Sequence, residues 1–474
     1  MLARELGPAA VLFSLPAPRF RTIHLLVGFR QTLDPGTVTR AALLTRVLYR
    51  GTGRLPDMTA LAGHLEDLYG ASLGTATTKL GDQEVLEATF SCAGPAGLRA
   101  IGAGPEAGDL PVHGARLLAE VFSDPAREGP GVAGLRPDYV RQEKQALARD
   151  IASISDDRAA YAHFRCLAEM CRGEPAALHS LGRAEDLPGI TLEDLDAYRR
   201  RVLAEAPLAA YLVGPVDDAV VAAVAAEFGE LTGGSGGGVR RGIPPSRAHE
   251  RPRAEREVLE DADVEQARLV VGLHTGVLAA DAEAPIQAFY NGLLGGFVHS
   301  RLFRVIREEA GLAYYAWSRV LATKGVILIS CGIQEKDYER ALGLIRRELA
   351  SLAEGKFSDA EFEATRNSVL AAAKAALDSP AGLVYAHLER LAVGSEAEEL
   401  APWRELARVT ADQVRAFGPR PVIDTVYLLR RGDKGAEVGR AAERVGRRPV
   451  GRAAVGRGAD GRGGGVSGRP EGRE

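Results

Sequence analysis

The stretch "RAALLTRVLYRGTG", residues 40–53, decides how this chain is interpreted. Its apolar residues recur with helical spacing, and the run ends in an aromatic residue followed by a Gly-Thr turn. Ala42, Thr45 and Arg46 stand at i, i+3 and i+4, so they share one face of the predicted helix. That spacing can present three groups to one metal ion or substrate, but here the groups are a methyl, a hydroxyl and a cation. The stretch therefore predicts either an ordinary packing helix or a catalytic helix whose ligands are missing.

Length and composition indicate a soluble globular protein of at least two domains. The 474 residues are too many for one compact core, and 46% hydrophobic and 26% charged residues are ordinary values. A formal net charge of −4 favours neither nucleic acid nor a membrane as partner, and no apolar run approaches the roughly 18 residues of a membrane span. The N-terminal stretch reads as mature protein rather than a signal peptide, because Glu5 precedes only a short apolar run. Four sparse cysteines without a CxxC motif are typical of reduced thiols, so we expect a cytoplasmic protein.

The two halves of the chain repeat one order of elements. Each half has a β-rich run, an apolar helix, a second helix ending near a Tyr, a strand hairpin, a long amphipathic helix and a closing strand. In the first half these are 21–31, 37–51, 58–72, 73–94, 137–157 and 208–216, and in the second 266–276, 284–296, 301–318, 319–334, 359–380 and 424–432. Hairpins interleaved with helices predict an α+β fold of two duplicated domains, each a mainly antiparallel sheet with helices on one face.

Two breaks in composition set the predicted domain boundaries. Residues 231–257 are rich in Gly, Pro, Ser and charge, which predicts a flexible linker joining the halves as a clamshell. After about residue 433, Gly and Arg dominate and large apolar residues are almost absent, which predicts a disordered tail. The predicted organisation is therefore an N-terminal domain, a linker, a C-terminal domain and a tail, at 1–230, 231–257, 258–432 and 433–474.

The duplicated layout resembles the insulinase/pitrilysin family of zinc peptidases, the inverzincins, over roughly residues 8–432. In that family the first apolar helix carries H-x-x-E-H, followed by an aromatic residue and a Gly-Thr turn. The two His bind zinc one helical turn apart, and the Glu acts as general base. Aligned on the aromatic residue and the turn, the same frame here reads Ala42-x-x-Thr45-Arg46. The resemblance thus implies a degenerate zinc motif, and Arg46 would repel a divalent cation.

The family's third zinc ligand is a Glu on a later helix, seven residues after another acid. The corresponding pair here is Glu143 and Asp150, which two helical turns place on one face. None of the nine His pairs with another at i, i+3 or i+4, so we predict no catalytic zinc and no metal site in this chain. An open alternative is an unrecognised metal site made of His64, Glu66 and Asp150, which would make the chain an active metallopeptidase.

The second half retains more of the family pattern. Family members carry an Arg and a Tyr seven residues apart, which bind the substrate backbone and help to stabilise the oxyanion. The stretch "IREEAGLAYY" supplies Arg307 and Tyr314 at that spacing, and the preceding "NGLLGGFVHSRLF" also resembles the family. A guanidinium and a phenol are suitable donors to a peptide carbonyl. The alternative is a surface cation pairing with Glu308 or Glu309, although immediate neighbours do not face each other on a helix.

These features predict a catalytically silent zinc-peptidase homologue. The resemblance implies that it pairs with an H-x-x-E-H-bearing chain, or with a second copy of itself, and binds a peptide through Arg307 and Tyr314. It implies no cofactor on this chain, with zinc only on the partner. A narrower resemblance, to a bacterial non-catalytic branch named for association with aminopentanol modification of elongation factor P, rests on "LEDLYGASLGTATTKLGDQEVL", "YVRQEKQALARDIASISDDRAAYAHFRCLAEM" and "IDTVYLLRRG". A peptide-binding scaffold without a peptidase role remains an alternative.

Overall fold

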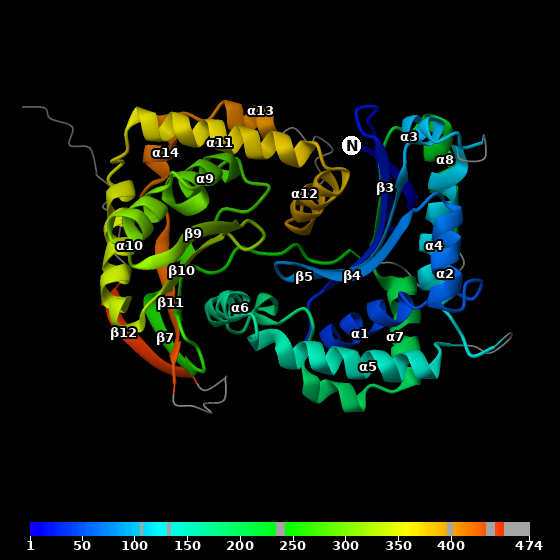
Figure 1. Cartoon of the computed structure of the whole chain (residues 1–474), viewed down its shortest axis with the longest axis horizontal. Coiled ribbons are helices and arrows are strands. Elements are labelled where there is room, and N and C mark those ends of the chain that lie inside the picture. The colour runs from blue at the N-terminus through cyan, green and yellow to red at the C-terminus, as the bar shows by residue number, and fades with distance from the viewer. Residues whose placement is uncertain (105–107, 130–133, 234–241, 396–401, 433–440, 450–474) are drawn as a thin grey trace, which may run out of the picture.

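A computed structural model describes residues 1–104, 108–129, 134–233, 242–395, 402–432 and 441–449 (Figure 1). Two α+β halves follow one another along the chain, and five strands of each sheet are equivalent and lie in the same order; the sixth is the first strand of the chain in one sheet and the last in the other. The predicted fold class, two duplicated domains with mainly antiparallel sheets, is confirmed. Among the residues that the structure describes, none of the helices combines the length and apolar character needed to span a lipid bilayer.

Six strands form the sheet of the first half in the order β1-β2-β6-β3-β5-β4. Their bounds are β1 Leu2–Gly7, β2 Ala10–Pro16, β3 Thr22–Thr32, β4 Ser72–Leu80, β5 Gln83–Ala93 and β6 Leu208–Gly214. Only β2 and β6 are parallel neighbours, and the other pairs are antiparallel. Strand β6 is buried along its whole length, so both faces of this sheet are covered.

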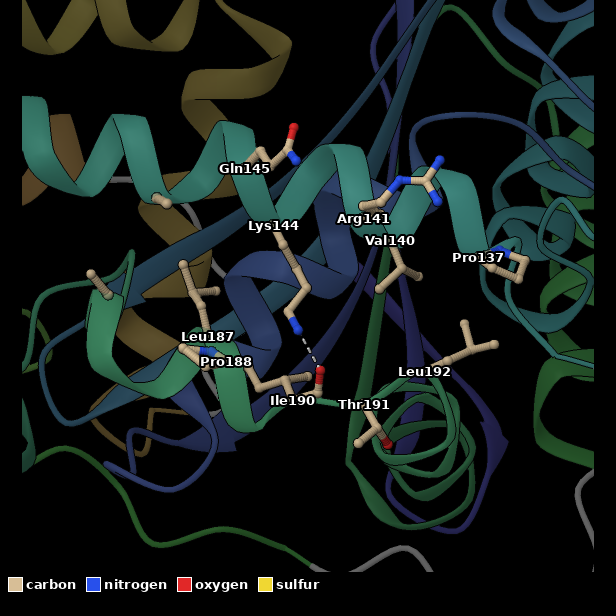
Figure 2. Close-up of a pocket in the computed structure, with 12 residues that line it drawn as sticks. Pro137, Val140, Arg141, Lys144, Gln145, Leu187, Pro188, Ile190, Thr191 and Leu192 are labelled. Carbon is tan, nitrogen blue, oxygen red and sulfur yellow. Dashed lines mark hydrogen bonds between the residues drawn. The ribbon is translucent and has the colours of Figure 1, made fainter.

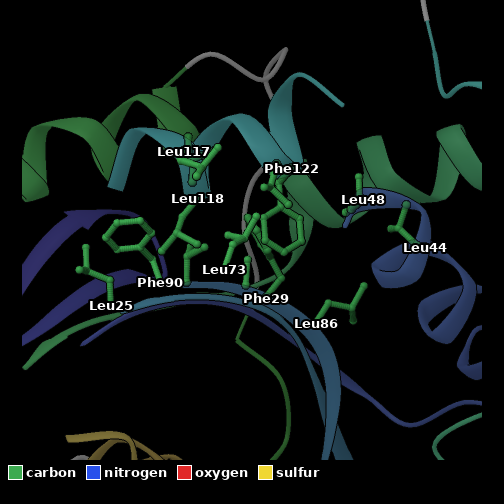
Figure 3. Packing of buried hydrophobic residues seen from close by; sticks show 14 of the residues in the cluster. Leu25, Phe29, Leu44, Leu48, Leu73, Leu86, Phe90, Leu117, Leu118 and Phe122 are labelled. Atoms are coloured by element: carbon green, nitrogen blue, oxygen red, sulfur yellow. The ribbon is translucent and has the colours of Figure 1, made fainter. Parts of the chain in front are cut away.

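The helices of the first half, apart from α6 Arg158–Met170, lie on one side of this sheet. They are α1 Val38–Leu48, α2 Met58–Asp67, α3 Pro95–Ala100, α4 Leu110–Ser123, α5 Pro137–Ala152, α7 Leu192–Glu205 and α8 Asp218–Gly233, with short 3₁₀ turns η2 Ser153–Ser155, η3 Pro175–Ala177 and η4 Ala184–Gly189. A capping box formed by Thr191 and Asp194 fixes the start of α7. In the core, the rings of Phe29 on β3 and Phe122 on α4 pack edge to face, and their ring centroids are 4.8 Å apart (Figure 3).

The second half repeats this topology. Its sheet has the order β12-β7-β11-β8-β10-β9, with β7 Ala254–Ala262, β8 Ala267–His274, β9 Ala313–Leu321, β10 Val326–Ile333, β11 Val422–Arg431 and β12 Ala441–Pro449. Again one pair, β7 and β11, is parallel. Its helices are α9 Ala284–Asn291, the π-helical η5 Gly292–Gly296 and η6 Phe303–Glu309, the 3₁₀ turn η7 Glu335–Asp337, α10 Tyr338–Ala353, α11 Asp359–Leu377, α12 Pro380–Ala392, α13 Pro402–Ala407 and α14 Ala411–Phe417.

One helix from each half of the chain covers the second face of the other half's sheet. Helix α6 of the first half lies on the second sheet, where Cys166 and Met170 share an apolar cluster with Val270 (Figure 1). Helix α12 of the second half lies on the first sheet, where Leu388 packs in a cluster with Tyr211. The Tyr211 hydroxyl also contacts His387 Nδ1 on α12 at 2.9 Å. The two halves are therefore interlocked by a reciprocal exchange of helices, a contact that the sequence did not predict.

A glycine on β8 allows α6 to approach the second sheet. A Cβ atom on Gly272 would lie 2.2 Å from the sulfur of Met170, far inside van der Waals contact. We expect Gly272→Ala to lower the free energy of unfolding by about 1–3 kcal/mol through overpacking, measured by chemical denaturation. Adding Met170→Ala removes the clash, so the double variant should lose less than the sum of the two single losses.

The matched control for this prediction is Gly343→Ala on α10, where a Cβ atom meets nothing within 4 Å. That change should be neutral or stabilising, because Ala favours a helix by about 1 kcal/mol over Gly. Equal effects of the Gly272 and Gly343 substitutions would contradict the docking of α6 on β8.

Two expectations about the connecting segments need correction. The predicted flexible linker 231–257 contains buried Ser246 and His249, whose amides donate to Ala392 and Lys324 carbonyls at 2.7 and 2.8 Å, and its last residues belong to β7. The predicted disordered tail contains strand β12, which pairs with β7 through backbone groups that need no particular side chains. Residues 234–241, 433–440 and 450–474 lie outside the described residues.

Candidate functional site

The degenerate motif on α1 faces two acids on α5, with an arginine between them. Arg46 Nη2 lies 2.7 Å from an Asp150 carboxylate oxygen, and Arg46 Nε lies 3.4 Å from Glu143. Arg50, in the turn just after α1, contacts the other oxygen of Glu143 at 2.9 Å. Two guanidinium groups thus balance two carboxylates. The structure brings Arg46 together with Glu143 and Asp150, a contact that the sequence did not predict, and the cation in contact with the acids is a side chain of the protein.

The other two positions of the motif offer no ligand. Ala42 and Thr45 are 2% and 3% exposed. The Thr45 hydroxyl donates back to the carbonyls of Ala41 and Ala42 at 3.2 and 3.3 Å, the usual arrangement for a Thr inside a helix. Strand β4 closes on this face of the helix, since the Thr75 hydroxyl donates to the Thr45 carbonyl at 2.7 Å. Helix α1 is therefore a packing helix, held in the core by its apolar stripe.

The alternative metal site at His64, Glu66 and Asp150 is wrong. The side chains of these three residues do not come close enough together to share one ion. His64 instead lies near the charged side chains of Arg54, Glu120 and Asp67. Within the described ranges, one group of three His, Cys or carboxylate donors comes close enough to hold a metal, and it lies elsewhere, at Cys171, Glu174 and His249.

Arg307 and Tyr314 lie side by side on the surface of the second half. Arg307 is on η6 and its guanidinium carbon lies 4.6 Å from the Phe303 ring centroid and 6.0 Å from that of Tyr314. Tyr314 is 78% exposed at the start of β9. No carboxylate pairs with Arg307 in the part of the chain that the structure describes, whereas the neighbouring Glu309 pairs with Arg304 at 3.5 Å. Stacking on two rings fixes the Arg307 plane and leaves its hydrogen-bond donors available.

Elements next to this pair are anchored by buried contacts. The Ser318 hydroxyl on β9 donates to the Asn291 side-chain carbonyl at 2.8 Å, and η5 approaches so closely that a Cβ atom on Gly295 would lie 2.8 Å from Ser318 N. Buried Arg301 donates to the Ser351 hydroxyl at 2.9 Å and to the Lys356 carbonyl. The residues of "NGLLGGFVHSRLF" that resemble the family thus hold η5, η6 and β9 in place.

Strand β9 is an edge strand of the second sheet, since it pairs only with β10 among the described strands. Trp317 on β9 stacks on His163 of α6 with ring centroids 4.7 Å apart. An edge strand offers unpaired backbone groups to an extended peptide. Arg307 and Tyr314 lie at one end of that edge.

A buried polar junction, defined here as Asp82, Glu174, His249, Lys324 and Asp424, joins the two halves. Asp82 is in the turn of the β4–β5 hairpin and Lys324 in the equivalent turn of the β9–β10 hairpin, so the duplication brings two matching turns together. The Lys324 ammonium contacts Asp82 at 3.0 Å and Glu174 at 2.6 Å. Sequence reasoning missed this junction, because its members are isolated polar residues in turns and in the predicted linker.

His249 lies between carboxylates of both halves. Its Nδ1 is 2.5 Å from Glu174 and its Nε2 is 2.9 Å from Asp424, so both ring nitrogens donate. Burial alone would lower the His249 pKa, but the hydrogen bonds to Asp424 and Glu174 raise it to about 9. The ring is therefore a buried cation at neutral pH.

An apolar groove of about 550 Å³ lies between α5 and the η4–α7 segment (Figure 2). Val140, Leu187 and Ile190 line it, and the Lys144 ammonium crosses it to the Ile190 carbonyl at 2.7 Å. None of its lining residues belongs to the Arg46 cluster or to the Arg307–Tyr314 pair. The groove is therefore separate from both candidate sites.

Comparisons with known proteins agree with this geometry. Residues 189–369 match a family described as the peptidase M16 inactive domain. The chain is 30% identical over 418 residues to a protein of Bacillus subtilis (strain 168) named probable inactive metalloprotease YmfF, covering 88% of this chain and 95% of that one. It is 25% identical to an uncharacterized zinc protease, SCO5738, of Streptomyces coelicolor, covering 62% and 66% of the two chains.

Solved structures share the fold. A conserved protein from Enterococcus faecalis V583 superposes with a TM-score of 0.78 at 23% identity, covering 92% of this chain and 99% of that one. A peptidase M16 inactive domain from Pseudomonas fluorescens gives 0.70 at 18% identity, covering 90% and 97%. Two duplicated α+β halves and a first helix without zinc ligands define a metallopeptidase homologue that has lost its catalytic site. The chain belongs to the peptidase M16 (insulinase) family and is an inactive homologue within it.

Proposed function

We propose that this chain is the non-catalytic subunit of a zinc peptidase, and that it contributes Arg307 and Tyr314 to binding the peptide substrate. The observation that carries the proposal is the contrast between its two halves. On α1 the positions of the two zinc ligands and the general base hold the buried methyl of Ala42, the guanidinium of Arg46 and the hydroxyl of Thr45. The hydroxyl is hydrogen-bonded within its own helix, and the guanidinium is paired with acids. On η6 and β9 the Arg–Tyr pair is exposed and free of ion pairs among the described residues.

The partner would supply the missing chemistry. An H-x-x-E-H helix provides two zinc ligands and a general base, none of which α1 offers. The partner is either a separate chain that carries this helix and the zinc or, for binding alone, a second copy of this protein. An extended peptide lying along the free edge of β9 would meet Tyr314 directly and Arg307 beside it.

The setting of this activity is also part of the proposal. We expect a bacterial, cytoplasmic protein, supported by four buried free cysteines and by the bacterial sources of the relatives named above. The link to elongation factor P modification rests on the narrower sequence resemblance.

The test is reconstitution with a co-purifying H-x-x-E-H chain. We expect no peptide hydrolysis from this chain alone, hydrolysis from the pair, and loss of hydrolysis when the Glu of the partner's H-x-x-E-H is changed to Gln. Hydrolysis by this chain alone, abolished by a chelator, would contradict the proposal. Peptide binding with no cleavage in any combination would favour the second candidate, a peptide-binding scaffold, which the same exposed pair also supports.

A further inference from the structure

We propose that Cys171, Glu174 and His249 form a binding site for one divalent cation of the zinc type, at the junction of the two halves. One donor atom from each residue, a sulfur, a carboxylate oxygen and a ring nitrogen, lies within 4.8 Å of the other two. Cys171 and Glu174 follow α6, and His249 comes from the segment that leads into β7. The site shares no residue with the degenerate motif on α1 or with the Arg307–Tyr314 pair.

The three donors are the ligand types that zinc prefers. Zinc binds Cys sulfur, His nitrogen and Glu oxygen at about 2.0–2.3 Å in a tetrahedral arrangement, so its ligand atoms stand about 3.3–3.8 Å apart. The His249 Nδ1 and the Glu174 oxygen are 2.5 Å apart and would have to separate by about 1 Å to share one ion. Three protein ligands leave the fourth position of a tetrahedral ion to water.

Asp424 binds the His249 ring nitrogen that faces away from the proposed site and so holds the ring in the orientation that a ligand needs. The Asp424 side chain is 1% exposed and accepts from His249 Nε2 at 2.9 Å, which directs Nδ1 towards Glu174 and Cys171. Asp424 is itself fixed, since its other oxygen accepts from the Thr425 hydroxyl at 2.6 Å. A carboxylate on the far nitrogen is the usual support of a metal-bound His.

The thiol of Cys171 has no other evident role. Cys171 is fully buried, and no hydrogen bond of its sulfur occurs among the described residues. Cys166, equally buried within α6, instead directs its sulfur to the Val270 carbonyl at 3.9 Å. Cys171 belongs to the apolar cluster around α6, and its sulfur lies in addition within 4.8 Å of a carboxylate oxygen and a ring nitrogen, the neighbours of a soft metal ligand.

Charges of both signs surround the proposed site. Three carboxylates, Asp82, Glu174 and Asp424, face the cations His249, Lys324 and Arg256, and Lys79 also acts on Cys171. Cys and His bind a metal ion in their deprotonated forms, so uptake of M²⁺ would release protons to the solvent. Lys324 contacts the Glu174 oxygen that does not face His249, so the metal and the ammonium use different oxygens of one carboxylate.

The proposed site lies between the two halves of the chain, so a cation bound there would connect them. Its ligands join α6 of the first half to the segment before β7, and Asp424 on β11 extends the connection into the second half. A bound cation would therefore fasten the two interlocked halves together.

The experiment uses the full chain, stripped with a chelator and titrated with Co²⁺ as a spectroscopic probe. We expect one Co²⁺ per chain, visible bands of a tetrahedral ion, a thiolate-to-cobalt charge-transfer band in the near ultraviolet, and displacement of the cobalt by Zn²⁺. Excess Zn²⁺ should raise the melting temperature of the stripped protein. Failure of the wild-type chain to take up Co²⁺ would overturn the proposal.

Cys171→Ser should abolish the charge-transfer band, and Cys166→Ser is its matched control and should retain it. A band that survives Cys171→Ser, or one that is lost with Cys166→Ser, would overturn the assignment of the ligands. If Cys171→Ser does not fold, His249→Gln replaces it, with loss of the stoichiometric Co²⁺ uptake as the expected result. Stoichiometric uptake that persists in His249→Gln would equally overturn the site.

Discussion

Lys324→Met is expected to lower the free energy of unfolding by about 3–5 kcal/mol, because it removes a buried ammonium from between two partly buried carboxylates. The Lys324 side chain is 3% exposed, and its ammonium contacts Asp82 at 3.0 Å and Glu174 at 2.6 Å. Methionine keeps most of the volume and removes the charge. The loss should appear in chemical denaturation of the full chain followed by circular dichroism.

The matched control is Lys336→Met, an exposed lysine just before α10. A surface substitution of this kind should change the free energy of unfolding by no more than about 0.5 kcal/mol. If the Lys324 variant were as stable as this control, water would have to reach the junction and the two hairpin turns would not be held together by charge. The prediction therefore tests the contact between the halves as well as the ion pair.

Much of the fold could be predicted from the sequence because its signals are local. The order of hairpins and helices in each half follows from short patterns, and the repeat of that order predicts the duplication. The two-turn spacing on α5 predicted that Glu143 and Asp150 share one face, but their pairing with Arg46 was not predicted. Arg307 and Tyr314 could likewise be placed together, because only one turn and the start of a strand separate them.

Contacts between residues far apart in the chain could not be predicted in this way. Glu174, His249, Lys324 and Asp424 come from four different segments, and none has a spacing that marks it as part of one cluster. The exchange of α6 and α12 depends on which open sheet face each helix reaches after the halves have formed. Strand β12 was missed because its pairing with β7 uses backbone groups, whereas its Gly- and Arg-rich composition predicted disorder.

Arg307→Ala is expected to reduce kcat of the reconstituted pair by about 100-fold, the size of effect seen when one oxyanion donor is lost. The family resemblance implies that the Arg307–Tyr314 pair also helps to stabilise the oxyanion, so loss of the Arg307 guanidinium should lower the rate more than it weakens binding of the ground state. Tyr314→Phe keeps the ring beside Arg307 and removes one hydroxyl donor, so a loss of about 10-fold is expected. The measurement is steady-state cleavage of a model peptide by the pair.

Arg304→Ala provides the matched control for the arginine, since Arg304 lies on the same segment but pairs with Glu309 and Glu361 at 3.5 Å. Its substitution should leave kcat of the pair unchanged, whereas a purely electrostatic effect of lost positive charge would lower the rate in both variants. An unchanged rate in Arg307→Ala would contradict the shared active site. A rise in KM at constant kcat would instead assign Arg307 to holding the peptide, because uniform binding lowers KM without accelerating the chemical step. The split between kcat and KM thus decides whether the second half takes part in the reaction or only presents the substrate to the partner's zinc.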